Sequence, residues 1–209
     1  MSSGGAIYVR DGDSEAVTGI VRALQQTPGV GAIFTRGAGP TSFDGQVPGT
    51  LSFDVVHWQH ERSAQILFSS DWTDAANSHG VRGSVMSGGT AGHGSSSPWD
   101  VHNTLIAAGP DFRSGITLDA PTANVDLMPT ILRLLQRPIP PGVQGRPLTE
   151  AFADQRARGV APVARTTEHT SRAPDGGYAV TAKLSIVRAG DREYRYFDGT
   201  IVTRRAVEK

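Results

Sequence analysis

The beginning of the chain restricts the fold more than any other part. Residues 15–26 place apolar side chains at helical spacing on one face, and Asp13 or Ser14 can cap the start of this helix. Apolar runs at residues 6–9 and 30–35 predict a short strand on either side. Strand, helix and strand in this order indicate a βαβ-like unit or half of a ferredoxin-like pair, and therefore an α/β fold.

Three later stretches also predict strands. Residues 51–56 alternate and then become apolar, and residues 64–68 form another short apolar run. Residues 104–108 follow a loop rich in glycine and serine, and we expect them to form a buried strand that holds this loop still. Residues 69–92 are polar and glycine-rich, and a loop of this length in a compact domain is usually functional or disordered.

A second helix is expected after Asp126, the predicted N-cap. Pro129 then falls within the first turn, where its missing N–H has no partner to lose. Four apolar side chains share one face of this helix: Met128, Ile131, Leu132 and Leu135. Prolines from Pro138 onward prevent its continuation, and residues 148–152 predict a further short helix.

Composition changes near residue 156 and divides the chain into three predicted parts. Residues 1–155 form an α/β domain, residues 156–162 a connector rich in basic residues, glycine and proline, and residues 163–209 a β-rich extension. Aromatic and β-branched residues at 178–187 and 193–197, separated by turn residues, predict antiparallel strands in this extension.

The overall composition excludes several classes of function. The 209 residues suffice for one domain with a real core, or for part of a larger one. A net charge of zero gives no bulk attraction to nucleic acid or to an anionic membrane. Without cysteine, any metal must be held by His, Asp or Glu, which favours zinc, manganese or iron. No apolar run reaches the length of a membrane helix, the first residues lack a signal-peptide pattern, and the compartment stays undetermined.

His93 is the candidate site residue. It stands among glycines and serines at residues 88–97, where glycine lets the backbone approach a ligand closely and the imidazole can bind a metal. The alternative for a lone histidine in a polar loop is a solvated or hydrogen-bonded residue. The other five histidines are expected on the surface or lack supporting context: His57, His60, His79, His102 and His169. The pairs Asp71-Trp72 and Trp99-Asp100 could line a pocket, and core packing is the alternative for them.

An ordered series of motifs resembles the alkaline phosphatase superfamily. Residues 93–112 carry His-Gly-Ser, then Ser-Pro-Trp-Asp-Val-His-Asn-Thr and an apolar run closed by Gly-Pro-Asp-Phe. This segment resembles the type I phosphodiesterase/nucleotide pyrophosphatase group and its sulfatase-like relatives. Residues 124–132 and 145–148 resemble the segments that follow in those proteins, and residues 7–36 the segment upstream. The match covers residues 7–152.

The resemblance implies a central sheet flanked by helices, here with an antiparallel β extension at the C-terminal end. It also implies two metal ions, usually zinc, and a Thr or Ser nucleophile that attacks the phosphorus or sulfur of an ester. His93 corresponds to the last metal ligand in chain order, with its other nitrogen oriented by a hydrogen-bond acceptor. The expected partner is a small phosphate or sulfate ester, with no nucleic-acid surface and no membrane.

The chain departs from this pattern in its other ligands. The nucleophile segment, the Asp-x-x-x-His pair and the Asp-His-Gly motif do not occur in the sequence. The resemblance therefore implies a C-terminal portion, with Met1 as an internal or misassigned start. One histidine cannot hold a catalytic zinc, which takes three protein ligands, so we expect no catalytic residue in this chain and no activity of the chain alone. The alternative is a non-catalytic scaffold fragment or interaction module.

A partial sheet has a physical consequence. It leaves an open edge and exposes the apolar side chains of Ile33, Phe34 and residues 105–108. We therefore expect poor solubility or an oligomer formed through the exposed sheet edge.

Overall fold

The computed structural model describes residues 4–39, 42–85 and 93–205. The chain divides into two compact units. The first unit comprises Met1–Asn103, Glu168–Lys183 and Phe197–Lys209, and the second comprises Thr104–Thr167 and Leu184–Tyr196. The boundaries at residues 155 and 163 stay predictions.

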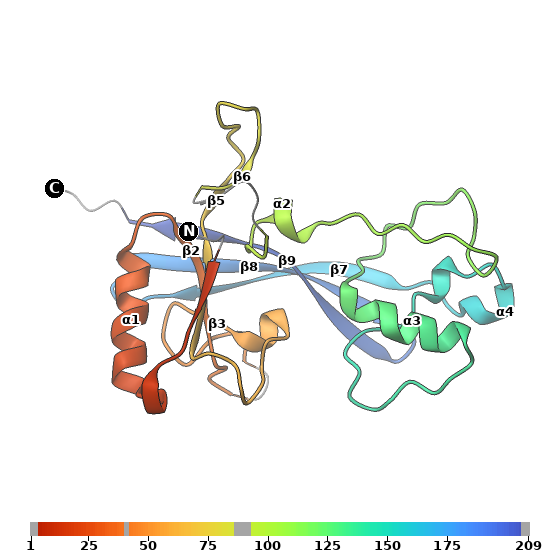
Figure 1. The fold of residues 1–209 in the computed structure, drawn as a ribbon, viewed down its shortest axis with the longest axis horizontal. Coiled ribbons are helices and arrows are strands. Elements are labelled where there is room, and N and C mark those ends of the chain that lie inside the picture. The colour runs from red at the N-terminus through yellow and green to blue at the C-terminus, as the bar shows by residue number, and fades with distance from the viewer. Residues whose placement is uncertain (1–3, 40–41, 86–92, 206–209) are drawn as a thin grey trace. The chain divides into compact units, whose positions relative to one another are not determined.

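The first unit contains a four-stranded sheet in the order β1-β4-β2-β3 (Figure 1). Its strands are β1 (Gly4–Ile7), β2 (Val30–Thr35), β3 (Leu51–Ser52) and β4 (Ile66–Ser70). The strand β4 runs antiparallel to both β1 and β2, and β3 runs parallel to β2. Since β1 and β2 therefore point the same way on either side of β4, the strand–helix–strand segment is a split βαβ unit, as in half of a ferredoxin-like pair.

The connecting helix α1 (Ser14–Gln26) forms as predicted. Its N-cap is Asp13, whose carboxylate accepts hydrogen bonds from the N–H groups of Glu15 and Ala16 at 2.9 and 3.2 Å. The side chains of Val17 and Val21, one turn apart on the apolar face, are fully buried. Local capping and periodicity thus suffice to define this helix.

The predicted exposure of Ile33 and Phe34 is wrong. Ile33 is fully buried and Phe34 is 2 % exposed. Side chains along a strand point alternately to the two faces of the sheet, and α1 packs against β2. The ring of Phe34 also meets the ring of Phe197 edge-on, with centroids 6.2 Å apart. Residues outside the sheet, from α1 and from β9 (Arg192–Arg204), therefore cover side chains of β2.

Two predicted segments have a different local structure. The strand predicted at residues 51–56 ends at Ser52, whose hydroxyl accepts a hydrogen bond from the N–H of Asp54 and caps a 3-10 helix, η2 (Phe53–Val56). The polar stretch after β4 is not wholly irregular. It contains a hairpin of β5 (Trp72–Thr73) and β6 (Gly83–Ser84), while residues 86–92 lie outside the described chain.

The buried strand predicted at residues 104–108 is also wrong. These five residues are exposed and belong to no strand, and Ile106 is 83 % exposed. Leu105 is 47 % exposed, so the expected exposure of the segment is confirmed. A short apolar run is compatible with several kinds of secondary structure. Residues 104–108 pair with no strand among the described residues. The loop before them is held by contacts with β4 and β9 instead.

In the second unit, α3 (Leu127–Leu134) follows the 3-10 turn η3 (Asn124–Asp126), and Pro129 lies in its first turn as predicted. The side chain of Asp126 makes no capping hydrogen bond to α3. Its two oxygens instead accept hydrogen bonds from the N–H groups of Ala123, at 2.9 Å, and Arg146, at 2.8 Å. Asp126 therefore joins the start of α3 to a segment twenty residues later in the chain.

A buried polar network occupies the second unit. The guanidinium of Arg146, 1 % exposed, donates hydrogen bonds to the hydroxyl of Tyr196 at 3.1 Å, to Glu150 at 3.0 Å and to the carbonyl of Pro121 at 3.2 Å. The hydroxyl of Tyr196 donates in turn to Asp126 at 3.2 Å. Burial, followed by the nearby Asp126 carboxylate, raises the pKa of Tyr196. Arg146 thus has its charge paired and its donors satisfied where water is excluded.

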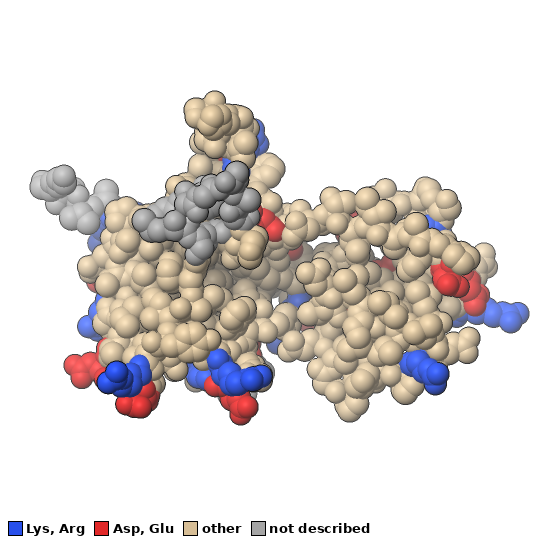
Figure 2. All heavy atoms as spheres, in the orientation of Figure 1, with Lys and Arg blue, Asp and Glu red and all other residues tan. Residues whose placement is uncertain are grey.

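The apolar face of α3 is largely exposed, whereas the amphipathic pattern of its sequence predicts that this face is buried. Pro129 and Thr130 are buried, whereas Met128, Ile131 and Leu135 are 46, 55 and 64 % exposed. Figure 2 shows that the surface over α3 carries few charged side chains. The remaining helical segments of this unit are η4 (Thr149–Ala151), which replaces the predicted short helix, and α4 (Gln155–Arg158).

The tail forms the predicted antiparallel strands. The strands β7 (Val163–Arg172), β8 (Tyr178–Ala189) and β9 form a sheet in that order. The connections between them are too short for any crossover, so neighbouring strands are antiparallel. The protein is therefore a mixed α/β structure with an antiparallel C-terminal part. Among the described residues, no helix is both long and apolar enough to span a membrane.

Gly145 allows a close backbone contact that can be tested. A Cβ at this position would lie 2.0 Å from the carbonyl oxygen of Val125 and 2.8 Å from the N of Asp126. We expect Gly145→Ala to lower the free energy of unfolding by about 1–3 kcal/mol, because backbone atoms must move. Urea denaturation followed by far-ultraviolet circular dichroism, which reports on both units, measures this.

Gly19 in α1 provides the matched control. A Cβ there would meet no atom within 4 Å, and the residue is in a helix interior. Gly19→Ala should raise the free energy of unfolding by about 0.5–1 kcal/mol. Equal effects of the two substitutions would contradict the close approach at Gly145.

Candidate functional site

His93 lies at the edge of an aromatic cavity in the first unit, which we name the His93 cavity. Its volume is about 490 Å³, within the range of roughly 300–1,000 Å³ typical of small-molecule sites. The residues that line it come from β1, β2, η2, β4, the loop after His93 and β9. The apolar side chains among them are Phe34, Val56, Trp58, Leu67, Phe68, Val101 and Phe197.

The aromatic walls are placed by the sheet. Phe34 is buried and contacts Phe197, while Phe68 points from the neighbouring strand β4. Gly5 in β1 makes room for the ring of Phe68, because a Cβ at this glycine would lie 2.8 Å from the ring. Trp58 is 45 % exposed. The cavity is therefore open and can accept an apolar group in contact with aromatic rings.

The loop after His93 is anchored to two strands. The N–H of Ser96 donates a hydrogen bond to the hydroxyl of Ser69, at 2.8 Å, in β4. Thr200 in β9 donates its N–H to the carbonyl of Ser96 at 3.0 Å and its hydroxyl to that of Ser96 at 2.7 Å. All three residues are buried. These contacts hold the backbone beside His93. The strand that was expected to do so, at residues 104–108, does not form.

A short helix strengthens the anchor. The hydroxyl of Ser97 caps α2 (Pro98–Val101) by accepting a hydrogen bond from the N–H of Trp99 at 3.2 Å. The carboxylate of Asp100 accepts hydrogen bonds from the N–H of Ser95, at 3.3 Å, and from its hydroxyl. The Ser-Ser-Ser-Pro-x-Asp pattern is thus a capped turn, a signal that the sequence carries locally.

The donors around His93 do not form a complete zinc site. Within the described part of the lining, the cavity presents no carboxylate and no second imidazole. The hydroxyl of Ser95 is directed to Asp100, and that of Ser96 accepts from Thr200. The described residues include no group of three His, Cys, Asp or Glu side chains that could hold a metal ion. His93, whose imidazole is exposed, fits one ligand position and not the three that a catalytic zinc takes.

The other histidines are not among the residues that line this cavity. His79 is exposed in the β5–β6 hairpin, and Nδ1 of His60 accepts a hydrogen bond from the N–H of Arg62 at 3.1 Å. His57 ends η2 in the left-handed conformation. His102 has its Nε2 3.8 Å from Asp198. None of these four lines the cavity.

His169 has a structural role that the sequence did not indicate. Its Nε2 lies 3.0 Å from the carboxylate of Asp44, and its ring stacks on Phe43 with centroids 5.2 Å apart. Burial alone would raise the pKa of Asp44, but hydrogen bonds from His169 and Ser171 outweigh it and lower the pKa. Because the two partners are 125 positions apart, no local pattern could predict this pair.

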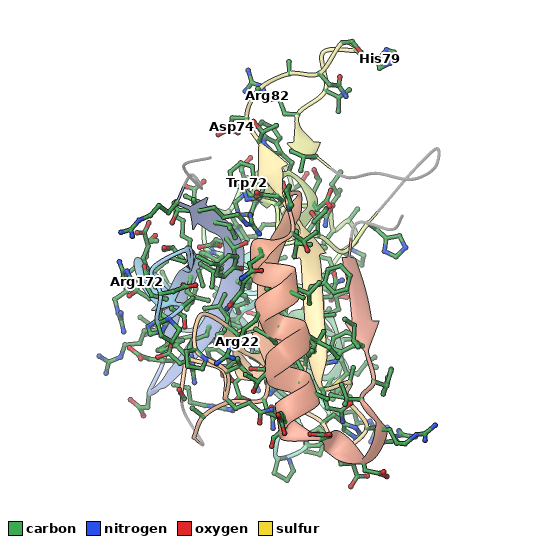
Figure 3. All side chains as sticks on the ribbon, turned by 90° about the vertical axis from the view of Figure 1, so that its left-hand side faces the viewer. Arg22, Trp72, Asp74, His79, Arg82 and Arg172 are labelled. Atoms are coloured by element: carbon green, nitrogen blue, oxygen red, sulfur yellow. The ribbon has the colours of Figure 1, made fainter. Side chains whose placement is uncertain are left out.

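Neither of the two aspartate–tryptophan pairs lines the His93 cavity, and Trp99 is 51 % exposed. The indole N–H of Trp72 donates to the carbonyl of Thr200. The indole N–H of Trp99 donates to Asp74 at 3.0 Å, and the guanidinium of Arg82 lies 5.6 Å from its ring centroid. Figure 3 shows Trp72, Asp74 and Arg82 on the hairpin that β5 and β6 form. The tryptophan that does line the cavity, Trp58, was not predicted.

Comparisons of the chain with models of known protein families, with curated proteins and with solved structures found no match.

The anchoring role of Asp100 can be tested by hydrogen exchange. We expect Asp100→Asn to speed amide exchange at residues 95–97 by about tenfold, because an amide oxygen accepts these hydrogen bonds more weakly than a carboxylate. Hydrogen–deuterium exchange with mass spectrometry measures the effect.

Asp74→Asn is the control, since Asp74 bonds only the exposed Trp99 indole among the described contacts. Exchange at residues 95–97 should stay within about twofold of the unsubstituted protein in this variant. Unchanged exchange in Asp100→Asn would show that Ser69 and Thr200 hold the loop without it.

Proposed function

We propose that the chain is part of a metal-dependent hydrolase of phosphoric esters, or of sulfuric esters, related to the phosphodiesterase/nucleotide pyrophosphatase branch of the alkaline phosphatase superfamily. The observation that carries the proposal is the position of His93. Its exposed imidazole lies at an open aromatic cavity, on a loop that Ser69 and Thr200 fix in place. The same histidine begins the series of motifs that resembles this superfamily.

In the proposed site, His93 supplies one metal ligand through a neutral ring nitrogen. Divalent zinc, two ions in the complete centre, would stabilise the negative charge that develops on the ester oxygens. The nucleophile and the other ligands would come from a polypeptide segment outside residues 1–209. Within this chain, the rings of Trp58, Phe68 and Phe197 would hold the apolar part of the ester and exclude water from it.

A zinc titration of the full chain tests the role of His93. We expect weak calorimetric binding of Zn²⁺, since one imidazole is a poor site, and no hydrolysis of bis(p-nitrophenyl) phosphate. His93→Ala should remove the binding, whereas His60→Ala should leave it unchanged because His60 is outside the cavity. Equal binding by the unsubstituted protein and His93→Ala would overturn the assignment.

If the chain alone hydrolyses the ester and His93→Ala abolishes this activity, the chain carries a complete centre.

A further experiment tests the complementing segment directly. The genomic DNA before the Met1 codon is read for an in-frame Asp-His-Gly and a Thr or Ser nucleophile, and that segment is co-expressed with the chain. Zinc-dependent hydrolysis that requires His93 would support the proposal, and its absence would count against it.

The second candidate function is a non-catalytic interaction module, and the surface of α3 favours it. Leu127, Met128, Ile131 and Leu135 of this helix segment are 42–64 % exposed. Single exposed apolar residues are ordinary, but several on one short helix mark a surface that another protein segment covers. Under this candidate, association through α3 is the function and His93 has no metal-binding role.

Light scattering tests whether the chain self-associates through the exposed surface of α3. We expect the purified chain to self-associate, and Ile131→Glu with Leu135→Glu to shift it to a monomer, since burying two carboxylates in a contact is costly. Arg133→Glu, an exposed substitution on the same helix, should retain association. A chain that is monomeric with and without the two substitutions would exclude self-association through α3.

A further inference from the structure

A second cavity of the first unit is lined by three arginines, and we name it the arginine cavity. Its volume is about 540 Å³. Four segments meet there: one side of α1, the loop before β3, the turn between β7 and β8, and the end of β9. The arginines are Arg22, Arg204 and Arg205, and the acidic residue among the lining is Asp175. The lining thus carries an excess of positive charge.

Arg204 is a fixed part of the cavity wall. Its guanidinium donates hydrogen bonds to the backbone carbonyls of Gln25, at 3.0 Å, and Val30. It also lies 3.5 Å from the carboxylate of Asp71 and 5.1 Å from the ring centroid of Tyr178. With its donors used in this way, Arg204 shapes the cavity and leaves ligand contacts to the other two arginines.

Arg22 and Arg205 are exposed, and within the described chain neither side chain has a hydrogen-bond or ion-pair partner. Asp175 makes no ion pair with either of them within the described chain, and its carboxylate accepts a hydrogen bond from the N–H of Gly177 at 2.8 Å within the turn. Two guanidinium groups thus face one cavity with their donors available. Guanidinium groups bind carboxylate, phosphate and sulfate through paired hydrogen bonds.

The remaining wall is apolar. Val47, 6 % exposed, lies beside Pro48, and Pro174 contributes from the turn between β7 and β8. Tyr178 is 2 % exposed: its hydroxyl donates to the carbonyl of Gly31 at 2.8 Å and the Arg204 guanidinium lies over its ring. The apolar surface open to a ligand therefore belongs to the exposed prolines Pro48 and Pro174. A ligand that fits both kinds of surface has an anionic group and an apolar body.

We propose that the arginine cavity binds a small organic anion, with Arg22 and Arg205 on its anionic group and Pro48 and Pro174 against its apolar body. The site is separate from the His93 cavity, shares none of its lining residues and needs no metal. It stands whether or not His93 binds zinc.

Arg172 offers a matched control for the two arginines. It is also exposed and lies in the first unit, on β7, but it does not line the cavity. Figure 3 shows Arg22 on α1 and Arg172 on its strand. Removal of the Arg172 charge changes the net charge of the protein by as much as removal of Arg22, so it separates a local site from general attraction of anions.

The test is calorimetric titration of the full chain with phenylphosphonate in the presence of a chelator. We expect saturable binding of one ligand per chain. Arg22→Gln with Arg205→Gln should weaken it by about tenfold or more, and Arg172→Gln by less than about twofold. Inorganic phosphate should bind more weakly than phenylphosphonate, benzyl alcohol should not bind, and His93→Ala should have no effect. Thermal unfolding of each variant checks that the exposed substitutions leave the fold intact.

Several results would overturn the proposal. Non-saturable heats, or an equal loss in Arg172→Gln, would show only general attraction of anions. Phosphate binding as tight as that of phenylphosphonate would exclude a contribution of the apolar wall. If the double variant unfolds at a lower temperature, the affinity of Arg22→Gln alone for phenylphosphonate is the test. An unchanged affinity in this single variant would show that Arg22 does not bind the anion.

Discussion

The insertion of β4 between β1 and β2 is the constraint on which the first unit depends. It makes β2 an inner strand and brings the fully buried side chain of Ile66 into the core. It also carries Phe68 to the wall of the His93 cavity and Ser69 to the backbone of Ser96. Core, cavity and anchored loop therefore share one strand, and a change of its register by one residue would move each of these side chains to the opposite face.

Local signals predicted the elements that have local causes. The helix α1 follows from its apolar spacing and from the Asp13 cap, and β2 has the predicted bounds. Pro129 lies in the first turn of α3, as its missing N–H requires. The failures have non-local causes. An apolar run such as 104–108 becomes a strand only where a partner strand is present, and the carboxylate of Asp126 is used by Arg146 instead of by its own helix.

The candidate site also combines a feature that the sequence predicted with features that it could not predict. The surroundings of His93 in the sequence marked it as a residue to inspect, and the structure places it at a cavity. The cavity itself could not be predicted, because Phe34, Phe68 and Phe197 come from strands far apart in the chain. The arginine cavity likewise joins Arg22 to Arg205, and only the fold brings them together.

The last residues of β9 complete structure that begins near the other end of the chain. Thr200 holds Ser96, and Arg204 donates to the carbonyls of Gln25 and Val30. During synthesis, α1 and the strands β1 to β4 leave the ribosome long before these partners exist. The first unit can therefore close its core only after residue 204 has been translated, and until then its early segments depend on their own weak local structure.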